Sequence, residues 1–163
     1  MKINKTFFAF IVAIFAMTLF SVMLVVNNLH STDKFRDSIT VSSDGKEFKK
    51  DFESFDLVPG KSIDYVVDMT IQQSGDYKLS LVFENLEGTG LDEYLDATIT
   101  FGDEQLYKGK LENLLADEII ERDFSADEKE VKSLKIVYSM DIGVGKECSG
   151  KTASFDMTLT VER

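Results

Sequence analysis

The chain is poor in the residues that most often carry catalysis, redox chemistry or metal binding. Its 163 residues include one cysteine, one histidine, one proline and no tryptophan. The lone Cys148 excludes an intrachain disulfide, so the fold must rest on its core. The lone His30 excludes H-E-x-x-H zinc sites, and because it closely follows the apolar run at 7–26, at its expected exit from a bilayer, it does not supply a Ser-His-Asp or Cys-His triad. We therefore interpret Cys148 as a structural thiol and His30 as incidental, and we predict no enzymatic activity.

The chain contains one long hydrophobic run, near its N-terminus. Residues 7–26 contain no charged side chain, and as a helix they would extend roughly 30 Å, the thickness of a bilayer core. Lys2 and Lys5 precede the run, which places the N-terminus in the cytoplasm and the remainder outside the cell. We expect residues 1–30 to be a signal anchor that holds a single-pass protein in the cell membrane. The alternative is a cleaved secretory signal, which would release a secreted protein, but no A-x-A-like cleavage site follows the run.

The remainder of the chain is strongly acidic. The net charge is −11, and because Lys2 and Lys5 supply all the charge of residues 1–30, residues 31–163 carry −13. Such a surface repels phosphate backbones and anionic lipid headgroups. Nucleic acid is therefore excluded as a partner, whereas divalent cations and cationic ligands are attracted to such a surface.

Apolar residues alternate with polar ones along most of this region, which indicates half-buried β-strands. Strands are expected at residues 39–41, 48–57, 63–71, 77–83, 97–101, 105–108, 134–140 and 153–161, with a short helical turn at 111–118. Turn residues 73–76 suggest a hairpin between the third and fourth strands, and Gly102 with Asp103 suggests a second hairpin. We predict an all-β fold, an antiparallel β-sandwich of seven or eight strands, immunoglobulin-like or jelly-roll-like, over residues 39–163. Residues 31–38 are expected to form a short polar stalk.

Clusters of carboxylates lie in or beside the predicted turns. Asp117, Glu118, Glu121 and Asp123 form the largest group and are weak candidates for a Ca²⁺ site, since Ca²⁺ prefers several converging oxygen ligands. The D-x-D-x-D-G loop of the EF-hand is absent, so a solvated acidic surface is the favoured interpretation and no cofactor is required. The glycine-rich loop 141–150 leads into a strand rather than a helix, which argues against a phosphate-binding role.

Three segments, taken in order, resemble a known family. They are FDLVPG at 55–60, LYKGKL at 106–111, and YSMDIGVGK at 138–146 followed by ASFDM at 153–157. Over about residues 45–163 the chain is similar to the TasA/camelysin family of small exported proteins of Gram-positive-type envelopes. The resemblance implies a β-sandwich with an N-terminal signal, and the best-known members are subunits of matrix fibres. Camelysin has been regarded as a metalloprotease, but this chain has no histidine cluster that could hold zinc.

These observations favour a non-enzymatic cell-surface or exported protein with a structural or adhesive role, such as a matrix or fibre component. Its partners are expected to be the membrane, through residues 7–26, and other copies or surface proteins that add a strand to an exposed sheet edge. The first alternative is a membrane-anchored binding module whose acidic loops hold Ca²⁺ or a cationic ligand. A third alternative is an extracytoplasmic hydrolase that uses a pair of carboxylates.

Overall fold

The computed structural model describes residues 32–52, 57–116 and 119–163, and Thr32–Arg163 forms one compact unit. Most of this unit is β-structure because apolar side chains recur at every second position. The nine strands of the described residues are β1 (Thr32–Val41), β2 (Lys46–Phe52), β3 (Ser62–Ile71), β4 (Gly75–Gly88), β5 (Leu95–Phe101), β6 (Glu104–Lys110), β7 (Ile120–Ala126), β8 (Val131–Met140) and β9 (Ala153–Glu162). The short helices are η1 (Asp92–Tyr94), α2 (Leu111–Leu115) and η2 (Lys146–Cys148).

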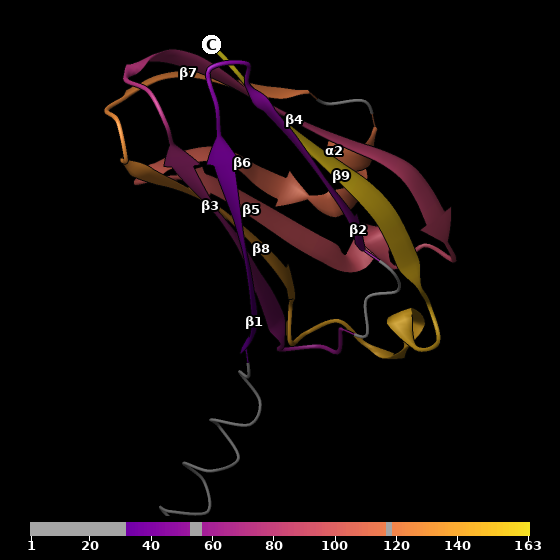
Figure 1. Ribbon diagram of the computed structural model, residues 1–163. Coiled ribbons are helices and arrows are strands. Elements are labelled where there is room, and N and C mark those ends of the chain that lie inside the picture. Colours follow the sequence, from indigo (N-terminus) through magenta and orange to yellow (C-terminus); the bar gives the residue numbers. More distant parts are fainter. Residues whose placement is uncertain (1–31, 53–56, 117–118) are drawn as a thin grey trace, which may run out of the picture. The chain divides into compact units, whose positions relative to one another are not determined.

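The strands form two sheets, as the ribbon in Figure 1 shows. One sheet has five strands in the order β1-β3-β8-β5-β6, and the other has four in the order β2-β9-β4-β7. All pairings are antiparallel except that of β1 with β3, which is parallel. From β2 onward the pairing is nested: β2 pairs with β9, β3 with β8, β4 with β7, and β5 with β6.

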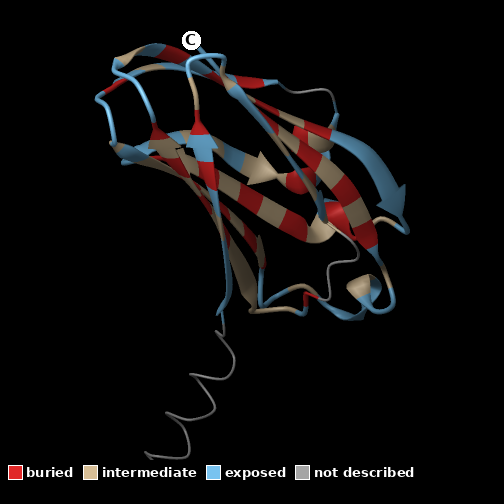
Figure 2. Ribbon diagram, viewed as in Figure 1, coloured by how far each residue is buried: buried red, intermediate tan, exposed pale blue. Residues whose placement is uncertain are grey.

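The core lies between the two sheets and is built from the inward side chains of both. Buried and less buried residues alternate along β3, β5, β8 and β9, which is visible as red and tan bands in Figure 2. Aromatic rings join the layers: Tyr138 of β8 lies 5.7 Å from Phe155 of β9, and Phe101 of β5 lies 4.9 Å from Phe124 of β7, measured between ring centroids. Such edge-on ring contacts add to the stabilisation that burial alone provides.

The predicted all-β fold is confirmed, and so are the Gly102 hairpin, the helical turn at 111–115 and the strands near residues 134–140 and 153–161. The predicted hairpin across residues 73–76 is wrong. β3 and β4 belong to different sheets, so this turn carries the chain from one layer to the other. The reason is non-local, because β3 pairs with β1 and β8 and has no free edge left for β4.

The predicted stalk at 31–38 is also wrong for the described part of that range. Thr32 already pairs with Ser62, and the strand continues to Val41 without a break. This edge strand carries polar and charged side chains that face water, so its backbone pairing leaves no hydrophobic signal in the sequence. Residues 1–30, including the apolar run at 7–26, lie outside the described residues. Within the described ranges no helix has the length and apolar character needed to cross a membrane.

We expect a charge on the inner face of β3 to unfold the domain, whereas one on the outer face should not. Val67 is fully buried, so Val67→Asp would leave an unpaired buried charge that costs several kcal/mol, close to the about 5–15 kcal/mol that holds a typical domain together. The adjacent Val66 is partly exposed between Arg36 and Lys135, so Val66→Asp is the matched control. Urea denaturation followed by circular dichroism measures both. Equal stability of the two variants would refute the two-layer packing.

Candidate functional site

The described members of the acidic group lie on a strand rather than in a loop. Glu121 and Asp123 stand two residues apart on β7, so both side chains point to the same outer face. Lys78 of the neighbouring β4 lies opposite Asp123 in the pairing, and its ammonium is 2.8 Å from the Glu121 carboxylate. The hydrogen bond to Glu121 raises the pKa of Lys78, helped by the charges of Asp123 and Glu162.

This geometry does not assemble the predicted Ca²⁺ ligands. Asp117 and Glu118 lie outside the described residues, while Glu121 is already paired with Lys78. Among residues 32–52, 57–116 and 119–163, no group of three acidic, histidine or cysteine side chains converges on a point where a metal could sit. Sequence reasoning missed that residues 120–126 form a strand, although Ile120, Phe124 and Ala126 supply the alternating signal and only Arg122 interrupts it.

A hollow in the surface lies at one end of the sandwich, between the segment before β3 and the loop before β9. It encloses about 590 Å³. One wall is apolar and consists of Leu57, Val58 and Pro59; the other is formed by residues 145–152. Gly60 adopts a positive φ of 82°, as the Leu-x-Pro-Gly pattern predicts, and this turns the chain sharply into β3.

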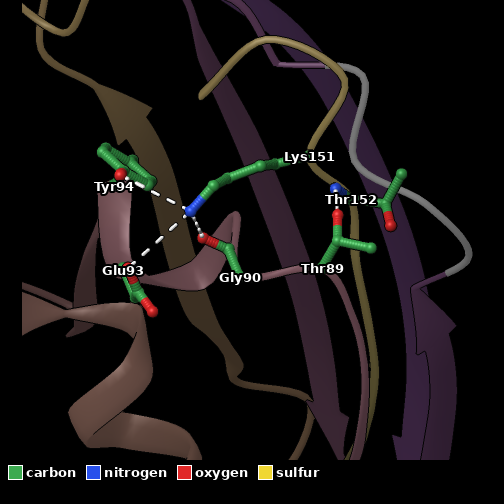
Figure 3. Close-up of polar contacts among 6 residues, drawn as sticks. All are labelled: Thr89, Gly90, Glu93, Tyr94, Lys151 and Thr152. Carbon is green, nitrogen blue, oxygen red and sulfur yellow. Dashed lines mark hydrogen bonds and ion pairs between the residues drawn. The ribbon is translucent and has the colours of Figure 1, made fainter. Parts of the chain in front are cut away.

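The side chain of Lys151 holds the loop before β9 against η1, as Figure 3 shows. Its ammonium lies 4.6 Å from the centre of the Tyr94 ring, 3.9 Å from the Glu93 carboxylate, and within 3.4 Å of the Gly90 carbonyl oxygen. The Lys151 side chain is only 27% exposed, so these contacts are poorly screened by water. Beside it, the Thr152 N–H donates to the Thr89 hydroxyl at 2.9 Å. The contacts therefore fix the end of the sandwich rather than leave Lys151 free for chemistry.

The other polar groups around the hollow serve the backbone of the same loop. The Cys148 thiol donates to the Gly145 carbonyl oxygen at 3.3 Å, and the Glu147 carboxylate accepts the Gly145 N–H at 2.9 Å. Hydrogen bonds from the backbone N–H groups of Glu147 and Gly145 lower the pKa of Glu147. None of these contacts joins a nucleophile to a general base, which is the arrangement that covalent catalysis uses.

The long edges of the two sheets are the other candidate interaction surface. β1 and β2 are edge strands on one side of the sandwich, and β6 and β7 are edge strands on the other. An ion pair ties the two layers on each side: Lys50 of β2 lies 3.4 Å from Asp37 of β1, and Arg122 of β7 lies 2.7 Å from Glu104 of β6. The Tyr65 hydroxyl also donates to Asp37 at 2.5 Å, and burial together with this bond raises the pKa of Tyr65.

No protein-family model matches the chain, and no curated protein matches it. The solved structures that match this chain include the pre-peptidase C-terminal domain of a collagenase from Bacillus anthracis, with 12% identity and a TM-score of 0.36 over 79% of this chain and 96% of that one. Another is PliG of Aeromonas hydrophila, a periplasmic inhibitor of g-type lysozyme, with 9% identity and a TM-score of 0.38 over 81% and 100%. The CUB1-EGF-CUB2 domains of rat MASP-1 give 11% identity and a TM-score of 0.38 over 80% and 42%.

We expect the acidic face of β7 to respond to divalent cations only by screening. Millimolar Ca²⁺ and Mg²⁺ should shift the melting temperature of the domain slightly and equally, because Glu121 is engaged by Lys78 and the surrounding field is diffuse. Differential scanning calorimetry with each ion measures the shift. A large, saturable shift specific to Ca²⁺, abolished by replacing Asp117, Glu118 and Glu121 together, would contradict this expectation and establish a Ca²⁺ site.

We also expect the Lys151 contacts to contribute measurable stability. Lys151→Met keeps the aliphatic stem but removes the cation, and should lower the free energy of unfolding by about 1 kcal/mol, the size of a partly desolvated cation–π pair. The control is Lys146→Met, which removes an exposed cation from the same loop and should change the stability by less than about 0.5 kcal/mol. Chemical denaturation measures both. If both substitutions changed the free energy of unfolding equally, the contacts of Lys151 with Tyr94 and Glu93 would contribute no measurable stability.

Proposed function

We propose that the protein is a non-enzymatic domain held at the cell surface by its N-terminal segment, with a structural or adhesive role in which copies join through their sheet edges. The observation that carries the proposal is that, within the described residues, each sheet ends on both sides of the sandwich in a strand with a single neighbour. An open edge offers a row of backbone N–H and C=O groups to an incoming strand. The polar groups around the hollow before β9, by contrast, are engaged in contacts that hold its own loops together.

The directions of the strands favour one particular junction. Along the four-stranded sheet each strand runs opposite to its neighbour, so β2 and β7 at the two edges point in opposite directions. A β2 strand placed beside the β7 strand of another copy would therefore continue the sheet in antiparallel pairing. A junction between two different edges leaves one free edge at each end, so it adds further copies instead of closing into a dimer, and it builds a filament when the rotation between copies does not close into a ring.

The charges of the two edges favour the same junction. The outer face of β2 carries Lys49 between Glu47 and Asp51, and β2 as a whole has three lysines and two acids. The outer face of β7 carries Glu121 and Asp123. Counted over the whole strands, β2 carries a net charge of +1 and β7 of −1, so charge favours a β2–β7 junction over a pairing of two β7 edges, which repel. Charged side chains on both edges also protect the free protein from indiscriminate pairing.

The resemblance to the TasA/camelysin family supports a role in surface fibres, and the nested pairing of β2 to β9 supports a jelly roll over the immunoglobulin arrangement. A hydrolase is not favoured, because no nucleophile–base pair occurs among the described contacts around the hollow. We do not extend the metalloprotease activity attributed to camelysin to this chain, since its one histidine cannot supply a zinc cluster.

The junction can be tested by disulfide trapping between copies of residues 32–163. Lys49→Cys and Asp123→Cys are combined in a Cys148→Ser background, where both new thiols lie on the outer face of the same sheet. Within one copy they are separated by β9 and β4, or about 14 Å, too far for a disulfide. Oxidation should therefore give a ladder of covalent oligomers on a non-reducing gel, and electron micrographs of the wild-type domain should show filaments.

Each single-cysteine variant is the matched control, and it can form a dimer but no longer species. A ladder absent from the double variant, together with a wild-type domain that sediments as a monomer at high concentration, would refute assembly through these edges.

A further inference from the structure

The tether between the apolar run and the domain is short. The run ends at Val26, and the first strand begins at Thr32. Residues 27–31 can therefore separate them by at most about 20 Å, even when fully extended. Because residues 32–38 belong to β1 instead of a stalk, the domain has little freedom to stand away from a bilayer that holds residues 7–26.

The end of the sandwich where the chain enters carries two neighbouring turns. Thr32 lies beside Ser62 at the start of β3, with their hydroxyls 2.9 Å apart, and Ser62 pairs with Ser139 near the end of β8. The turn at 58–61 precedes β3 and the turn at 141–144 follows β8. Backbone hydrogen bonds from Gly60 to the Met140 carbonyl and from Met140 to the Lys61 carbonyl join them, at 3.0 and 3.2 Å. Figure 1 shows the start of β1 and both turns together at the lower end of the domain.

Each turn presents an aliphatic side chain to water. Val58 is 46% exposed and Ile142 is 53% exposed, although the rest of the domain surface is rich in charge. The carboxylate of Asp141, which precedes Ile142, is turned back on its own loop, where it accepts the Gly143 N–H at 2.6 Å. Lys61 precedes β3 and Lys146 follows the second turn, and lysines beside apolar tips are well suited to lie at the level of lipid headgroups.

We propose that these two turns, with Val58 and Ile142 at their tips, form a docking surface for the lipid bilayer. The proposal rests on the retained anchor of the proposed function. The anchor keeps the domain beside the bilayer, where the local concentration of lipid is high. A weak apolar interaction between the two turns and the lipid therefore suffices. Docking at this end would hold β1, β2, β6 and β7 away from the bilayer along the sides of the sandwich, where their edges are accessible to other copies.

The absence of tryptophan provides a direct test. The full-length chain carrying Ile142→Trp is reconstituted in phosphatidylcholine vesicles, with and without brominated acyl chains that quench tryptophan on contact. The matched control is Val131→Trp, which is equally exposed at 55% but lies at the opposite end of β8, about 30 Å away. We expect blue-shifted emission and at least twofold stronger quenching for Ile142→Trp, and water-like emission for Val131→Trp.

Flotation of the same vesicles separates the two claims. If the chain floats but both tryptophans are equally unquenched, the docking surface is refuted while the tethered domain stands. If the chain does not float, both the tether and the docking are refuted. If Ile142→Trp emission is blue-shifted but unquenched, and the shift disappears on dilution, a second copy covers the turns instead of lipid, and the proposal fails.

Discussion

Burial of the inner face of two sheets against each other is the constraint on which the rest of the structure depends. With a single cysteine there is no intrachain disulfide to reinforce the domain, so stability comes from side chains such as Val67, Leu81 and Phe155 packed between the layers. A shift of one residue in any inner strand would expose this face, which fixes the register of the sheets. The perimeter of the sandwich, which consists of the edge strands and of the turns at the two ends, is not held by this constraint. We place function there for this reason.

The sequence allowed the inner strands to be predicted well, because burial on one face leaves a period of two. Ten apolar side chains that alternate along the predicted strands 63–71, 77–83, 134–140 and 153–161 are all buried: Tyr65, Val67, Met69, Leu79, Leu81, Ile136, Tyr138, Phe155, Met157 and Leu159. The pattern could not show which strands pair. Residues 73–76 have the composition of a hairpin turn, yet they join two layers, since β3 finds its partner in β8 some sixty residues later. Seven or eight strands were expected, and the described residues contain nine because β7 was missed; β1 was expected only from residue 39, with its first part assigned to a stalk.

The perimeter was predicted less well for a physical reason. The first part of β1 faces water, so its side chains carry no burial signal, and in β7 the exposed Arg122 interrupts the alternation of Ile120, Phe124 and Ala126. Both errors matter for function. Because residues 120–126 form the strand β7, Glu121 lies beside Lys78 and does not belong to a cation-binding loop. Assigning residues 32–38 to β1 removes the stalk and leaves a short tether, which brings the end of the domain close to any bilayer that holds the apolar run.

The central claim is that the domain works while attached to the membrane, and the fate of residues 1–30 decides it. Intact mass spectrometry of the native protein, recovered separately from membranes and from the medium, tests this most directly. The account predicts that the membrane fraction contains the complete chain of 18.4 kDa and that the medium contains little of it. Recovery of most of the protein from the medium, with a mass that lacks the apolar run, would contradict the tether and the placement of the domain against the bilayer.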